Sequence, residues 1–167
     1  MTRQDTIWKW LAYGIMLAAT AIVNYYILGP LPIALPLLLP MAAVAVGTLE
    51  NPKFGAGFGL AAGLVMATAG HHSLLCIPIL SAAGWLCAMV AQYVLRRDLV
   101  GHLIYAVITA FLWESVQVLW HLSRNTAPLP LLLGVAGGEL LWTLVFSIPV
   151  YWAGRFCCIR CGRIYHE

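Results

Sequence analysis

Charged side chains are scarce in this chain, and their scarcity excludes most soluble folds. Only 9% of the 167 residues are Asp, Glu, Lys or Arg, whereas 62% are hydrophobic and the mean hydropathy is +0.89. Soluble domains carry about 25% charged residues, so the composition predicts an integral membrane protein. Two uncharged runs, residues 10–49 and 54–95, are each long enough for two helices of about 20 residues.

The chain also lacks the alternation of polar and apolar residues that marks a transmembrane β-strand. We therefore expect an all-α bundle. It has no HExxH zinc signature, no Gly-x-Ser-x-Gly elbow and no phosphate-binding glycine loop. We expect neither an enzyme nor a cofactor site, and no nucleic-acid partner.

Turn signals divide the chain into six expected membrane helices, at about residues 8–28, 33–49, 54–70, 74–95, 99–122 and 129–153. Residues 1–155 then form one six-span transmembrane domain, and residues 156–167 form a basic, cysteine-containing tail. Pro36 and Pro40 predict a kinked or partly unwound entry to the second span. Such an entry is tolerated at membrane depth only where protein surrounds it.

Glycines are concentrated in the third expected span. Gly55, Gly59 and Gly63 fall four residues apart, so they share one face of a helix. In lipid, small residues let neighbouring helices approach closely, and we predict that this span is the central one around which the others pack. Gly84 of the following span joins these packing glycines. The alternative is a glycine-rich membrane helix with no special partner.

Positive residues are distributed unevenly over the six-span arrangement. One side has only Arg124, and the other has Arg3, Lys9, Lys53, Arg96, Arg97, Arg155, Arg160 and Arg163. Because Lys and Arg gather in cytoplasmic segments, both termini are predicted to be cytoplasmic. Trp8, Lys9 and Trp10 are predicted to anchor the first span at the membrane interface.

Polar residues interrupt the last two spans. Glu114, Gln117 and His121 share a face of the fifth, and Glu139 lies in the sixth. Both carboxyl groups fall about 12–15 Å below the outer surface on adjacent antiparallel helices, so we expect them to face each other, with Asn24 of the first span at a similar depth. A carboxylate at that depth must be protonated, paired or hydrated. The cluster would suit a small-molecule site, a proton relay, or a contact that fixes helix packing and receives a partner's helix.

The tail holds the remaining candidate site. Cys158-Ile-Arg-Cys161, with Cys157 and His166, has spacing suited to zinc. A single CxxC is a weak signal, and the arginines of this segment indicate a basic tail at an anionic lipid surface. We therefore favour the lipid-facing tail over a metal site.

Several motifs, taken in order, resemble the MreD family of bacterial rod shape-determining membrane proteins, and the likeness extends from about residue 8 to residue 155. The motifs are Gly59-x-x-x-Gly63-Leu64, Gly70, Gly84-Trp85-Leu86, Arg96-Arg97, Leu112-Trp113-Glu114-Ser115, Glu139-Leu140-Leu141-Trp142 and Pro149. The chain departs from the family at Ala67, where an aspartate is common, and it lacks an acidic residue early in the second span.

The resemblance implies a non-enzymatic scaffold in the bacterial inner membrane. Such a protein binds the single-span protein MreC and helps link MreB filaments to the glycosyltransferase and transpeptidase that build peptidoglycan. The family's fold is similar to that of the six-helix substrate-binding subunits of energy-coupling-factor vitamin transporters, and a subunit of that kind is the alternative. Those subunits usually carry an Ala-x-x-x-Ala pair on the first span, and none occurs between Trp8 and Leu28.

Overall fold

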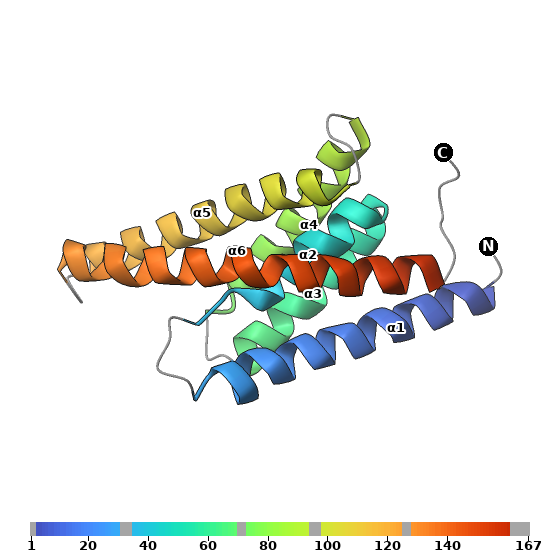
Figure 1. Cartoon of the computed structure of the whole chain (residues 1–167), viewed down its shortest axis with the longest axis horizontal. Helices are drawn as coiled ribbons and strands as arrows, with labels where there is room; N and C mark the ends of the chain where they lie inside the picture. Colours follow the sequence, from blue (N-terminus) through green and yellow to red (C-terminus); the bar gives the residue numbers. More distant parts are fainter. Residues whose placement is uncertain (1–2, 31–34, 70–72, 94–97, 125–127, 161–167) are drawn as a thin grey trace.

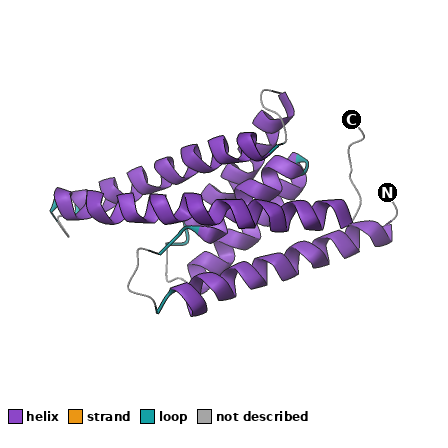
Figure 2. Ribbon diagram, viewed as in Figure 1, coloured by secondary structure: helices purple, strands orange, loops and turns teal. Residues whose placement is uncertain are grey.

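The computed structural model describes residues 3–30, 35–69, 73–93, 98–124 and 128–160, and these residues form helices joined by short turns (Figure 2). No strand occurs in these ranges, so the predicted all-α class is confirmed. In chain order the elements are α1 (Arg3–Ile22), the π-helix η1 (Val23–Leu28), α2 (Leu38–Leu49), α3 (Pro52–Ala69), α4 (Cys76–Tyr93), α5 (Leu99–Ser123) and α6 (Leu129–Arg160).

Four helical segments are long and apolar enough to cross a membrane: Thr6–Leu28, Cys76–Tyr93, Leu99–Ser123 and Leu129–Ile159. They support a multi-pass membrane protein, as the composition predicts. The start of α1 and the end of α6 lie at the same end of the molecule (Figure 1). That end is called the terminal end below, and the other is called the distal end.

The second predicted span is a shorter helix than expected. Residues 35–37 are not helical, and α2 begins at Leu38, which confirms the predicted unwound entry. Pro40 lies in the first turn of α2. Proline is tolerated there because the backbone N–H groups of the first turn make no intrahelical hydrogen bond. The N–H of Leu37 instead donates to Thr143 Oγ1 of α6 at 2.9 Å, so protein surrounds the unwound entry.

The centre of the bundle is α2, and the prediction that the glycine-rich span is central is wrong. Every residue from Leu38 to Thr48 is buried, and α2 packs against α1, α3, α4, α5 and α6. The physical reason is visible in its sequence, because α2 is apolar or small around its whole circumference and therefore has no face suited to an exterior position.

The glycine row of α3 instead forms one close helix pair with α4. A Cβ atom at Gly55 would lie 2.5 Å from the Gly84 carbonyl oxygen, and one at Gly63 would lie 2.6 Å from Ile77 Cα. A Cβ at Gly59 would collide with the Leu80 carbonyl oxygen, and one at Gly84 with the Gly55 carbonyl oxygen. All four predicted packing glycines therefore lie where two backbones touch.

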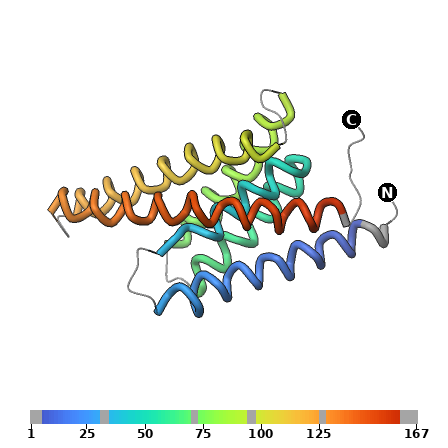
Figure 3. The backbone as a smooth tube through the Cα atoms, viewed as in Figure 1, coloured from blue at the N-terminus to red at the C-terminus, as the bar shows by residue number. Residues whose placement is uncertain are grey.

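The two longest helices, α5 and α6, run antiparallel and extend beyond the other helices at the distal end (Figure 3). The Asp98 side chain caps α5 by accepting from the Gly101 N–H at 2.9 Å. At the terminal end α6 continues to Arg160, so residues 156–160 of the predicted tail are helical. Residues 161–167 lie outside the described part, as do the motif residues Gly70, Arg96 and Arg97.

A buried ion pair joins α1 to the end of α2. Lys9 Nζ lies 2.6 Å from Glu50 Oε1, and the two side chains are 0% and 1% exposed. The Tyr13 hydroxyl donates to the same Glu50 oxygen at 2.6 Å. The prediction of an interfacial anchor is therefore wrong for Lys9, whereas Trp8 and Trp10 are exposed. The signal for the burial of Lys9 is the spacing of Lys9 and Tyr13, which puts both on one helix face.

Candidate ligand cavity

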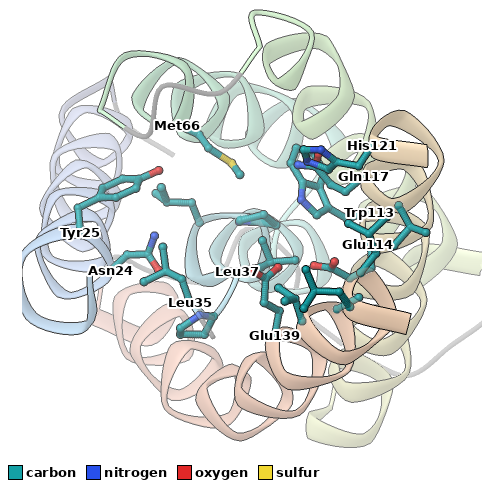
Figure 4. A pocket seen from close by; sticks show the side chains of 18 residues that line it. Asn24, Tyr25, Leu35, Leu37, Met66, Trp113, Glu114, Gln117, His121 and Glu139 are labelled. Atoms are coloured by element: carbon teal, nitrogen blue, oxygen red, sulfur yellow. The ribbon is translucent and has the colours of Figure 1, made fainter. Parts of the chain in front are cut away.

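A cavity of about 300 Å³ lies in the distal half of the bundle (Figure 4). Its wall is built from η1, the unwound entry to α2, and parts of α2, α3, α5 and α6. The lining residues are Asn24, Tyr25, Leu35, Pro36, Leu37, Leu39, Pro40, Met66, Trp113, Glu114, Gln117, Val118, His121, Leu131, Leu132, Val135, Ala136 and Glu139.

The structure brings all five residues of the predicted polar cluster to this one cavity. Asn24 comes from η1, Glu114, Gln117 and His121 come from α5, and Glu139 comes from α6 (Figure 4). Asn24 and Glu114 are each 5% exposed, whereas Gln117 and Glu139 are half-buried. Elements far apart in the sequence thus contribute to a single polar site inside an apolar bundle.

The two carboxyl groups lie side by side on the wall formed by α5 and α6. The side chains of Glu114 and Glu139 point toward each other (Figure 4), and the two carboxyl groups interact electrostatically. Two adjacent carboxylates repel each other unless a shared proton or a cation compensates for their charge. The described lining contains no Lys or Arg that could supply that cation.

Three buried polar atoms of the cavity wall have no hydrogen-bond partner within the described ranges: Asn24 Oδ1, Glu114 Oε1 and the Tyr25 hydroxyl. The first two are acceptors, and the hydroxyl can both donate and accept. A buried polar group without a partner costs about 1–3 kcal/mol, so native structures rarely retain one without a reason. Acceptors of this kind at a cavity are suited to receive the donors of a ligand.

The π-helix η1 positions one wall of the cavity. Its wider turns follow directly from α1 and place both Asn24 and its neighbour Tyr25 on the lining. Single π-turns inside membrane and soluble helices often mark functional positions. The sequence did not reveal this turn, because the spacing of Tyr13, Leu17 and Asn24 fits an ordinary α-helix.

Only five of the eighteen lining residues were predicted as site residues, and Tyr25, Met66 and Trp113 are among the thirteen that were not. Aromatic and apolar residues are so frequent in this chain that these three did not stand out in the sequence.

A further polar residue, His102, is fully buried outside the cavity. Its Nε2 atom lies 3.3 Å from the Ser147 carbonyl oxygen, and its ring stacks on Tyr151 with the centroids 5.0 Å apart.

The described residues contain no group of three or more His, Cys, Asp or Glu side chains that could hold a metal ion. Of the predicted tail cluster, Cys157 and Cys158 lie on the last turns of α6, and Cys157 Sγ lies 4.0 Å from the Ala12 carbonyl oxygen. Cys161 and His166 are outside the described residues.

The polar side chains of the cavity lining can bind a ligand or exchange protons. The polar groups are carboxyls, amides, a phenol and an imidazole in an otherwise apolar wall, as in sites that orient a bound molecule.

Comparisons of the chain with protein-family models, curated proteins and solved structures find no match.

Proposed function

We propose that the chain is a scaffold of the bacterial cell-elongation machinery, of the MreD type. It binds an MreC-like single-span protein and through it helps couple MreB filaments to the glycosyltransferase and transpeptidase that build peptidoglycan. The observation that carries the proposal is the meeting of Glu114 and Glu139 at one cavity. Each residue belongs to one of the ordered motifs that carry the family resemblance, so these two motifs contribute to one site.

The scaffold has six spans in this proposal. The twelve helical residues of α2 rise about 18 Å, which is less than the hydrocarbon thickness of about 30 Å. The non-helical residues 35–37 add about 10 Å if extended. A broken span of this kind is acceptable in lipid because the surrounding helices cover its backbone, as α2 is covered here.

The proposed location is the bacterial inner membrane, with both termini in the cytoplasm and the cavity in the outer half. The excess of Lys and Arg at the predicted inner surface supports this orientation. The shared position of the start of α1 and the end of α6 agrees with an even number of spans (Figure 1).

A second candidate is the substrate-binding subunit of an energy-coupling-factor vitamin transporter. The observation that favours it is the cavity itself, with its buried acceptors Asn24 Oδ1 and Glu114 Oε1. The missing Ala-x-x-x-Ala pair on the first span argues against it.

Depletion of the protein in a rod-shaped host distinguishes the two candidates. The scaffold proposal predicts round cells with unchanged vitamin uptake, and shape should return when the wild-type chain is supplied. Cells that stay rod-shaped but lose uptake of a vitamin would overturn the scaffold proposal and favour the transporter subunit.

A further inference from the structure

We propose that the cavity binds a small organic cation that carries a second polar group. Its ammonium or amidinium group lies at Glu114 and Glu139, and its second polar group lies at Asn24. This proposal goes beyond the scaffold function, since it concerns a small molecule and does not depend on which protein is the partner.

The charge of the wall is the first argument for a cation. The described lining has two carboxyl groups and one histidine, and no Lys or Arg. Glu114 and Glu139 are adjacent, so a ligand cation between them would relieve their repulsion. An anionic ligand would add to that repulsion.

The unpartnered acceptors are the second argument, and they suggest a ligand with two ends. Asn24 and Glu114 are each only 5% exposed, and each has an oxygen atom without a hydrogen-bond partner in the described part of the chain. Asn24 and Tyr25 lie on one side of the cavity, and Glu114 and Glu139 lie on the other (Figure 4). A molecule with donors at both ends satisfies both acceptors.

The rest of the wall suits an organic ion better than a metal ion. Trp113 and Tyr25 supply aromatic rings, which attract ammonium groups by about 0.5–2 kcal/mol. Leu37, Leu39 and Met66 supply apolar surface for a hydrocarbon body. A metal ion would need a cluster of ligands, and the described residues contain no such cluster. The volume of about 300 Å³ is at the small end of ligand pockets.

Tyramine is a suitable probe, because it joins an ammonium group to a phenol through a short apolar body. Its alcohol analogue tyrosol and its carboxylate analogue phloretate keep the hydroxyphenyl ring and replace only the ammonium group. Isothermal titration of the purified full chain in detergent should show tyramine binding at least about ten-fold tighter than tyrosol, as expected for a charged hydrogen bond. Phloretate should bind most weakly.

Two variants locate the binding. Glu114→Gln and Glu139→Gln should each weaken tyramine binding by about ten-fold or more, with little effect on tyrosol. The control is Ser115→Ala, because Ser115 is the neighbour of Glu114, does not line the cavity and bonds to the Phe111 carbonyl oxygen. It should bind tyramine like the wild type.

Three results would overturn the proposal: no saturable tyramine binding, equal affinity for tyramine and tyrosol, or unchanged tyramine binding in both glutamine variants. Should Glu114→Gln fail to fold, the half-buried Glu139 still provides a variant, and the tyramine-to-tyrosol ratio needs only the wild type. Failure here leaves the scaffold proposal standing, since that proposal is tested by cell shape. Rod-shaped cells after depletion would in turn leave the titration result standing.

Discussion

Two groups of buried polar side chains differ in how their hydrogen bonds are satisfied. Lys9, Tyr13 and Glu50 satisfy one another at contacts of 2.6 Å. Asn24 and Glu114, at the cavity, each keep an acceptor that no described residue satisfies. A complete cluster holds helices together, whereas an incomplete one is suited to a ligand. The first group therefore stabilises the fold, and the second is the one that we propose to bind a ligand.

At the residue scale, breaking the buried ion pair should destabilise the protein strongly. Glu50→Gln leaves Lys9 charged and buried, which costs about 3–5 kcal/mol. Adding Lys9→Met removes that uncompensated charge, so the double variant should unfold at a higher temperature than Glu50→Gln alone. Thermal unfolding in detergent measures this. Additive losses in the double variant would show that the two charges do not compensate for each other.

Removing an unpaired acceptor from the cavity should have the opposite effect on stability. Asn24→Leu removes a buried amide oxygen that has no partner, so we expect a gain of about 1–3 kcal/mol in the free energy of unfolding. The same change should weaken tyramine binding. Ser115→Ala is the control for both measurements. An Asn24→Leu protein that is less stable than the wild type would show that the amide already has a structural partner.

The sequence predicts the residues of the cavity better than it predicts the ion pair. Helical spacing and depth place Glu114 and Glu139 together, because both quantities are read along single helices that are adjacent in sequence. Lys9 and Glu50 belong to helices whose contact depends on how the bundle assembles. Their ion pair depends on the tertiary structure, which the local sequence does not show. In the sequence, Lys9 lies between two tryptophans and has the pattern of an interfacial residue.

At the scale of the elements, the close pairing of α3 and α4 depends on the missing side chains of their glycines. The spacing of Gly55, Gly59 and Gly63 predicts a close contact but does not identify the partner helix. The central helix is α2, because the other helices can cover a short helix without a polar face more easily than a long one. Its proline-rich entry predicted the local unwinding correctly, since that effect is set by the residues themselves.

Gly59→Ala should separate α3 from α4. A Cβ atom there would collide with the backbone of Leu80 and Ser81, and overpacking of this kind costs about 1–3 kcal/mol. Gly14 is the matched control, because it also lies in a helix and a Cβ atom there meets nothing within 4 Å. Gly14→Ala should be neutral or stabilising, since alanine favours helices by about 1 kcal/mol over glycine.

Unfolding of both variants in the same detergent provides the test. A Gly59→Ala protein as stable as Gly14→Ala would contradict the close α3–α4 contact. Gly29 is unsuitable as a control, because a Cβ atom there would collide with the Tyr25 carbonyl oxygen.

At the scale of the whole molecule, the proposed orientation predicts where reporters will be active. Green fluorescent protein fused after Glu167 should fluoresce, because the C-terminus is proposed to be cytoplasmic. Alkaline phosphatase fused after Arg124, in the turn between α5 and α6, should be active outside the cytoplasm. Phosphatase activity from the C-terminal fusion would contradict an even number of spans with cytoplasmic ends.

The central claim is that the protein works by holding a partner of the cell-elongation machinery, and purification of the tagged chain from native membranes tests it most directly. We predict that mass spectrometry will recover an MreC-like single-span protein in near-equal amount. Glu114→Ala should reduce that recovery more than it reduces expression, whereas Ser115→Ala should leave it unchanged. Recovery of a transporter's ATPase subunits in place of an MreC-like protein would contradict the account.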